Sequence, residues 1–116
     1  MIDVVTLYRP VGTAELKLIE LSGWKAFPPR LPDQPIFYPV TNEEYASMIA
    51  RDWNVKYNDD KRGYVTKFGV VADVANSYER QIVGGSICEE LWVPAEELEA
   101  FNKAIVGKIE VTASFK

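Results

Sequence analysis

The chain has 116 residues, of which 47% are apolar, 26% are charged and 12% are aromatic. This composition predicts one globular domain over residues 1–116, with enough apolar side chains to build a core. The formal net charge is −4, and no basic run exceeds the pair Lys61 and Arg62. Proteins that bind nucleic acid gather Lys and Arg on one face, so we do not expect a nucleic-acid partner.

Histidine is absent and Cys88 is the only cysteine. The absence of histidine excludes Ser/His/Asp and Cys/His nucleophilic sites and His-ligated zinc, and the carboxylates show no EF-hand spacing, so no metal site is predicted. No apolar run approaches the roughly 20 residues that cross a bilayer. The first residues also lack the basic start and apolar segment of a signal peptide. We therefore expect a cytoplasmic protein without a membrane partner, and a single cysteine favours a reducing compartment.

The first residues predict a strand followed by a helix. Residues 4–9 are rich in β-branched and aromatic side chains, as strands are. Pro10 cannot donate to a central ladder, so we expect the strand to end there. Thr13 is placed to cap a helix over residues 13–22, and Gly23 is placed to end it.

The next segment predicts a stiff loop, a short strand and a second helix. Residues 27–35 contain four prolines, which exclude a helix or a central strand, and residues 36–40 predict a strand. Thr41 and Glu44 have the spacing of a capping box, in which each side chain binds the other residue's backbone amide. They begin a helix over residues 42–53, whose apolar side chains recur at helical spacing. Those side chains are Tyr45, Met48, Ile49 and Trp53.

The second half of the chain predicts mostly strands. These are residues 64–71, 77–83, 87–93 and 108–115, and residues 94–105 predict one more helix. Strands that follow one another through short turns favour antiparallel pairing. We therefore predict an α+β fold with a mainly antiparallel, split or half-barrel sheet and about three helices.

Three residues in the first half are candidates for ligand binding. Arg9 lies at the end of the first strand, just before a glycine-containing turn, where it can bind a phosphate or a ribose. The alternative is a solvated side chain or a structural ion pair. Tyr38 and Tyr45 offer rings for stacking on a flat ligand, and the alternative for both is a place in the core.

Two carboxylates begin the apolar strand near residue 90. Alternation places Glu89 and Glu90 on opposite faces, with Leu91 and Val93 on the face of Glu89. If those apolar residues are buried, Glu90 shares its face with Trp92. A carboxylate there can orient a ribose hydroxyl or stabilise an oxocarbenium-like transition state. The alternative is a charged guard on an edge strand.

Three segments occur in the order found in the small ADP-ribosyltransferase fold, which the chain resembles. They are LYRPVG (7–12), IFYPVTNEEYA (36–46) and ELWVP (90–94). The chain also resembles, over nearly its full length, a family of small bacterial proteins labelled ADP-ribosylation/crystallin J1. It departs from the transferase pattern in lacking a Ser-Thr-Ser motif. It also has Cys88 two positions before Glu90, where arginine- or asparagine-modifying enzymes have Glu or Gln.

The resemblance implies a protein that binds NAD as its substrate. Arg9 would hold the adenosine side of NAD, Tyr38 or Tyr45 would line the nicotinamide pocket, and Glu90 would bond the nicotinamide ribose. The implied activity is transfer of ADP-ribose to an acceptor, such as a protein, or cleavage of NAD. The alternative is a non-catalytic binding or regulatory module on the same fold, with a protein partner.

The proline-rich loop is the remaining candidate for the ligand site. Prolines restrict motion and leave backbone acceptors unpaired, which suits the wall of a cleft. We therefore predict that residues 27–35 border the cleft and that Arg30 reaches into it.

Overall fold

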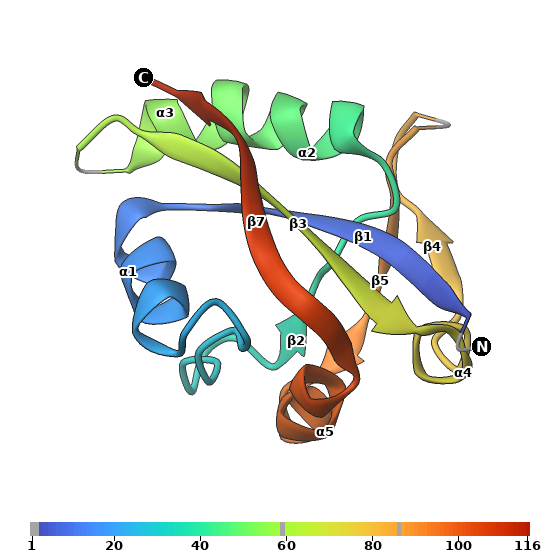
Figure 1. Cartoon of the computed structure of the whole chain (residues 1–116). Coiled ribbons are helices and arrows are strands. Elements are labelled where there is room, and N and C mark those ends of the chain that lie inside the picture. Colours follow the sequence, from blue (N-terminus) through green and yellow to red (C-terminus); the bar gives the residue numbers. More distant parts are fainter. Residues whose placement is uncertain (1–2, 59, 86) are drawn as a thin grey trace.

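The computed structural model describes residues 3–58, 60–85 and 87–116, which form an α+β fold with antiparallel sheets (Figure 1). The elements in chain order are β1 (Val4–Val11), α1 (Thr13–Leu21), β2 (Ile36–Phe37), α2 (Glu43–Ile49), the π-helical turn η1 (Ala50–Asn54), α3 (Val55–Tyr57), β3 (Gly63–Val71), α4 (Ala72–Ala75), β4 (Arg80–Ile82), β5 (Glu89–Leu91), β6 (Val93–Pro94), the 3-10 turn η2 (Ala95–Glu97), α5 (Leu98–Lys103) and β7 (Ile105–Phe115).

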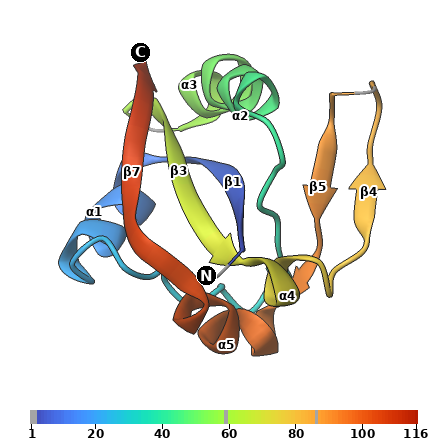
Figure 2. The same cartoon turned by 45° about the vertical axis from the view of Figure 1, so that its right-hand side comes forward.

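The strands of the described residues pair in three groups, two of which are connected through Val40. The largest group has three strands in the order β1-β3-β7, and both neighbouring pairs are antiparallel. Strands β4 and β5 form an antiparallel hairpin, and β2 pairs with β6. Val40 bridges to Tyr8 in β1 on one side and to Glu90 in β5 on the other. Figure 2 shows the segment that leads into α2 running between β1 and the hairpin. The predicted antiparallel α+β fold is confirmed.

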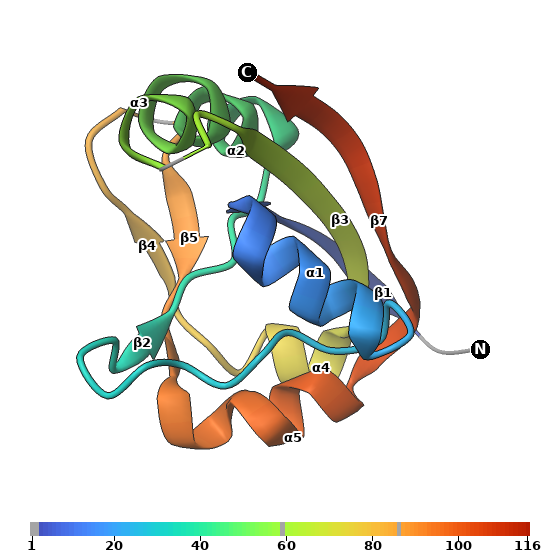
Figure 3. The same cartoon turned by 90° about the vertical axis from the view of Figure 1, so that its left-hand side faces the viewer.

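Two apolar clusters form the core. The larger contains Leu7 and Phe68, and the smaller contains Val65, with Tyr8 packed against it. Because neighbouring residues of a strand point to opposite faces, Leu7 and Tyr8 direct β1 into both clusters. Helices α2 and α3 lie at one end of the molecule and α5 at the other, with α1 between them against the sheet (Figures 1 and 3).

Strand β1 continues through Pro10 to Val11, so the prediction that it ends at Pro10 is wrong. β1 is an edge strand of the three-stranded sheet, and Tyr8 directs its N–H away from β3, to the carbonyl oxygen of Val40 at 2.9 Å. Pro10 lies two residues further and faces the same outer side. Pro10 has no N–H, but an N–H at this position would point away from β3, so no hydrogen bond to β3 is lost. Arg9 therefore lies within this edge strand and not at its end.

Helix α1 begins at Thr13, but Thr13 is not its cap. Gly12 holds the N-cap position, and the Thr13 hydroxyl donates to the carboxylate of Asp60 instead. Gly23 follows the helix with a φ of 79°, a left-handed conformation that glycine adopts easily. The predicted end of this helix is therefore confirmed and its predicted cap is wrong.

Asn42, rather than Thr41, caps α2. The side-chain oxygen of Asn42 accepts a hydrogen bond from the N–H of Tyr45 at 2.7 Å. The N–H of Thr41 donates to the carbonyl oxygen of Glu89 at 3.1 Å, so Thr41 takes part in the pairing with β5. The predicted capping box is wrong by one residue, because a long-range contact holds Thr41 outside the helix.

The second helix continues past its predicted end, through η1, to Tyr57. Gly63 allows the π-helical turn to pack closely on β3, since a Cβ at that position would lie 2.5 Å from the carbonyl oxygen of Ala50. A π turn contains an extra residue, which changes the direction of the side chains after it. Trp53, expected on the apolar face, is accordingly 62% exposed.

Strands β3 and β7 confirm the strands predicted near residues 64–71 and 108–115. Strands β4 and β5 are shorter than the segments predicted at 77–83 and 87–93. Helix α4 directly follows β3, and no feature of the sequence predicts it. If the continuous run of α2, η1 and α3 is taken as one helix, and η2 with α5 as another, the described residues form four helical segments rather than the three predicted.

The last predicted helix, over residues 94–105, is shorter than expected. It begins with η2 after Pro94 and ends at Lys103. Ile105 belongs to β7, where it pairs with Val70 of β3. The ladder offers hydrogen bonds to Ile105 that the end of a helix does not, so the strand extends toward the helix. Within the parts of the chain that the structure describes, no helix is both long and apolar enough to cross a membrane.

Candidate functional site

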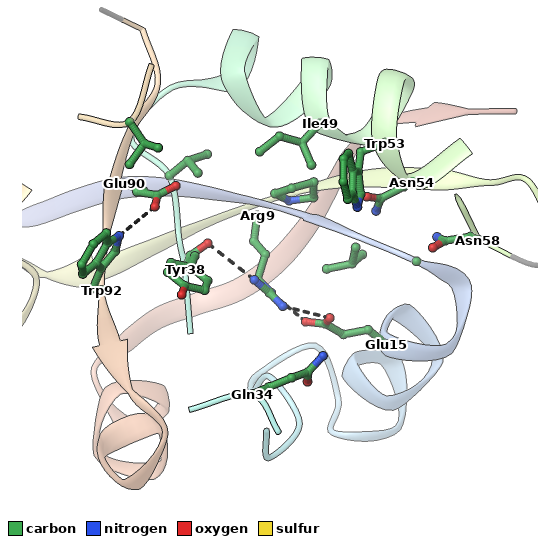
Figure 4. Close-up of a pocket in the computed structure, with 15 residues that line it drawn as sticks. Arg9, Glu15, Gln34, Tyr38, Ile49, Trp53, Asn54, Asn58, Glu90 and Trp92 are labelled. Carbon is green, nitrogen blue, oxygen red and sulfur yellow. Dashed lines mark hydrogen bonds and ion pairs between the residues drawn. The ribbon is translucent and has the colours of Figure 1, made fainter. Parts of the chain in front are cut away.

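A cavity of about 560 Å³ lies at the outer edge of β1 (Figure 4). Its walls come from the end of β1, the start of α1, the proline-rich loop, the helical run around η1 and the β4–β5 hairpin. Its size is within the range of pockets that bind small molecules. The lining residues are Arg9, Pro10, Val11, Gly12, Glu15, Gln34, Tyr38, Val40, Ile49, Trp53, Asn54, Asn58, Val83, Glu90 and Trp92.

The cavity brings together three of the four residues that the sequence analysis selects. Arg9, Tyr38 and Glu90 all line it. The fourth, Tyr45, is not one of the lining residues, but its hydroxyl donates to Oε2 of Glu90 at 3.1 Å. Tyr45 therefore contacts the site through Glu90, and its ring does not line the cavity.

Arg9 forms a structural ion pair, which was one of the two alternatives for this residue. Its Nε and Nη2 donate to the carboxylate of Glu15 at 2.8 and 3.1 Å. Its Nη1 donates to the carbonyl oxygen of Tyr38 at 3.5 Å, and its guanidinium lies 4.6 Å from the centre of the Phe37 ring. With 8% of its surface exposed, Arg9 still faces the cavity from this fixed position.

Two neutral donors hold the carboxylate of Glu90. Besides Tyr45, the indole N–H of Trp92 donates to Oε1 of Glu90 at 2.7 Å. None of the ion pairs among the described residues involves Glu90. The carboxylate is thus fixed in position, and among the described residues it forms no ion pair with a cationic side chain.

The strand pairing of Glu90 excludes the role of an edge-strand guard. Glu90 pairs with Gln81 of β4 on one side and with Val40 on the other. Leu91 and Val93 are fully buried, so Glu90 and Trp92 share the opposite face, as the alternation predicts. Glu89, on the other face, lies 3.8 Å from Arg80.

Aromatic rings surround the Glu90 end of the cavity. Tyr38 and Trp92 are 39% and 44% exposed, and their ring centres lie 6.2 Å apart at an interplanar angle of 88°. Phe37, the neighbour of Tyr38, is fully buried, so the two rings point to opposite faces, as the alternation of side chains along an extended segment requires. Tyr38 is therefore available to a ligand and is not part of the core.

The proline-rich loop borders the cavity through Gln34, as predicted. Arg30 is not one of the lining residues, so its predicted position is wrong in this detail. Its Nε is buried and has no hydrogen-bond partner among the described residues. Burial lowers the pKa of Arg30, and the nearby positive charge of Arg9 lowers it further, while Glu15 acts in the opposite direction. Two guanidinium groups and one carboxylate thus influence one another at this end of the cavity, and only Arg9 forms an ion pair with Glu15 among the described residues.

The spacing of residues in the sequence does not indicate several of the residues that line the cavity. Glu15 lies in the first turn of α1, where the sequence suggests only an interaction with the helix dipole. Trp53 reaches the cavity because η1 turns it out of the apolar face. Gln34 has no chemical signal in the sequence beyond its place in the loop.

The described ranges contain no cluster of metal-ligating side chains. Across residues 3–58, 60–85 and 87–116, no group of three or more Cys, Asp and Glu side chains is placed to hold a metal ion. The charged and aromatic side chains that line the cavity are Arg9, Glu15, Tyr38, Trp53, Glu90 and Trp92.

Comparison of the chain with family models, with curated proteins and with solved structures finds no match. The resemblance to the ADP-ribosyltransferase fold thus stays a prediction that rests on the sequence segments named above.

The contact between Tyr45 and Glu90 gives a prediction about stability at high pH. Burial, followed by the charge of Glu90, raises the pKa of Tyr45 to about 12 from its ordinary 10. Below the ordinary value the phenol is protonated in both states. As the pH rises from 10 toward 12, the unfolded chain loses this proton before the folded chain does, so the free energy of unfolding should fall.

Urea denaturation of wild type and Tyr45→Phe at several pH values tests this prediction. The free energy of unfolding should fall less in the variant than in wild type between about pH 9 and pH 12. Tyr78, whose pKa is also raised to about 12 by burial and by Glu97, is present in both proteins and cancels in the comparison. A difference between the two proteins that stays constant over this range would contradict the coupling.

Proposed function

We propose that this chain is an NAD-binding, ADP-ribosyltransferase-like protein that transfers ADP-ribose from NAD to an acceptor or cleaves NAD. The observation that carries the proposal is the carboxylate of Glu90, which is fixed on the cavity wall by Tyr45 and Trp92 and has no cationic partner among the described residues. A carboxylate already paired with Lys or Arg would have little charge left for a substrate.

The reaction needs such a carboxylate. Cleavage breaks the bond between C1′ of the ribose and the ring nitrogen of nicotinamide, and the bonding electron pair leaves with nicotinamide. Positive charge then develops on the ribose, which a nearby carboxylate stabilises. The acceptor, or water, forms a new bond to C1′ and releases its proton.

The charges along the cavity support an extended, bipolar ligand. Contacts run from Arg9 to the carbonyl of Tyr38, from the Tyr38 ring to Trp92, and from Trp92 to Glu90. Arg9 is paired with Glu15 at one end, and the partly buried guanidinium of Arg30, although it does not line the cavity, adds positive charge near them. NAD carries a diphosphate in its middle and a positively charged ring at one end, so the diphosphate would lie toward Arg9 and the ribose of nicotinamide toward Glu90.

One observation favours the alternative, a non-catalytic binding module. Arg9 is nearly buried and bound to Glu15, and it packs over the ring of Phe37. An arginine with these contacts can serve the fold alone. In that case the cavity would bind a ligand or partner without any reaction.

Two measurements on the purified protein separate the alternatives. Calorimetry with NAD measures binding, and release of nicotinamide in a cell extract that supplies acceptors measures turnover. Binding with release is the expected result. Binding without release would favour the module, and the absence of both would refute NAD as the ligand.

A further inference from the structure

Arg30, in the proline-rich loop, is the one partly buried arginine without a side-chain or backbone partner among the described residues. Arg9, Arg51 and Arg80 each form an ion pair, and Arg62 is exposed to solvent. The Nε of Arg30 is buried and donates no hydrogen bond to a described residue. A guanidinium that loses water without gaining an acceptor destabilises the fold, so the position of this side chain calls for an explanation.

The charged groups near Arg30 do not compensate its charge. The carboxylate of Glu15 already accepts two hydrogen bonds from Arg9, at 2.8 and 3.1 Å. Burial lowers the pKa of Arg30, and the charge of Arg9 lowers it further by more than the charge of Glu15 raises it. Two guanidinium groups and one carboxylate thus leave an excess of one positive charge, and that charge is on Arg30.

The outer end of the Arg30 guanidinium is open to solvent. Nε is the one nitrogen of this side chain that is buried without a partner, so the two Nη groups, which also form no hydrogen bond with a described residue, are accessible. They do not face the cavity, because Arg30 is not one of its lining residues. Two parallel N–H groups match two oxygens of a phosphate or carboxylate group, which is why arginine so often binds these anions.

We propose that Arg30 binds a small oxyanion, a phosphate or carboxylate group, at a site outside the cavity. The anion would accept hydrogen bonds from the two Nη groups and would compensate the excess positive charge beside Arg9. Gln34 of the same loop lines the cavity, so the bound anion would also hold this wall of the cavity in place. The proposal rests on Arg30 and its surroundings and not on the proposed function.

The Nε–H signal of Arg30 in nitrogen–proton NMR spectra reports on this site directly. Because the Nε–H is buried, its proton should exchange slowly with water and give a visible signal, which Arg30→Met assigns by removing it. Inorganic phosphate and sodium acetate are the two probes, and at least one of them should shift the signal along a saturable curve. Sodium chloride at the same ionic strength should not, because chloride screens charge without matching the two parallel N–H groups.

Variants show whether the guanidinium of Arg30 causes the binding, with the backbone amide signal of Leu31 as the readout in every protein. Arg30→Met should weaken binding of the probe by at least roughly tenfold, the factor expected when charge-assisted hydrogen bonds are lost. Arg30→Lys keeps the charge without the planar pair of donors and should lie between wild type and Arg30→Met. Arg62→Met makes the same change at an exposed arginine and should bind the probe as wild type does.

The titration of wild type decides the proposal even if Arg30→Met does not fold, since the Nε–H signals of Arg9 and Arg30 are separate reporters. A response of Arg30 no larger than that to chloride, or a response confined to Arg9, would refute the site. Binding of the probe should persist when NAD is present, and displacement of the probe by NAD would refute a site outside the cavity. If NAD itself does not bind, the proposed function falls while the result for Arg30 stands.

Discussion

Replacement of Glu90 by glutamine is expected to slow the release of nicotinamide from NAD by roughly 10²–10³-fold, the usual loss for one electrostatic contact in a transition state. The amide has nearly the shape of the carboxylate and keeps an oxygen for one of the two donors, Tyr45 or Trp92. It lacks the negative charge that would stabilise the ribose as the bond to nicotinamide breaks. The loss should appear in the rate at saturating NAD, because the charge acts mainly in the transition state.

The neighbouring carboxylate provides a matched control. Glu89→Gln makes the same chemical change one residue earlier, on the face that points to Arg80 and away from Glu90. Its rate should be close to that of wild type. Both variants should also unfold in urea within about 1 kcal/mol of wild type, since each gives up at most one side-chain hydrogen bond. Equal rates in Glu90→Gln and wild type would refute the role of Glu90.

Replacement of Phe37 by alanine is expected to destabilise the fold by about 3–5 kcal/mol. The ring is fully buried, and its centre lies 5.1 Å from that of Phe27 and 5.7 Å from that of Phe101. Alanine would leave a cavity among these rings and remove the ring beneath the guanidinium of Arg9. The free energy of unfolding from urea titration measures the effect.

Leu31, in the proline-rich loop, offers a control for this core substitution. Its side chain is 61% exposed, so Leu31→Ala should change the free energy of unfolding by no more than about 0.5 kcal/mol. If Phe37→Ala costs as little as Leu31→Ala, the packing of the three rings does not support this part of the fold.

Alternation within strands made several features of the site predictable from the sequence. Phe37 and Tyr38 had to face opposite ways, and the buried Leu91 left Glu90 on the face of Trp92. These predictions need only the two-residue period of a strand and the solubility of each side chain. The second helix and the end of the first helix at Gly23 were also predictable, because the sequence signals for both lie within a few neighbouring residues.

The tertiary structure decided the helix caps and the length of the strands. Thr13 could cap its own helix or bind Asp60, and Thr41 could cap the next helix or pair with Glu89. In both cases the partner lies more than forty residues away and competes with the local contact. Pro10 fits its strand because that strand is at an edge, a fact of the sheet order and not of the sequence around it.

The sequence by itself determined which residues could carry chemistry, namely Arg9, Tyr38 and Glu90, because charge, ring and strand position belong to each residue. Only the tertiary structure decided that they share one cavity and what each does there. Val40 joins β1 to β5 and so places Glu90 on the same cavity as Arg9. The ion pair of Arg9 with Glu15 depends on how the helix after β1 packs back onto the strand. Such contacts follow from long-range pairing and packing, for which no short stretch of sequence holds the information.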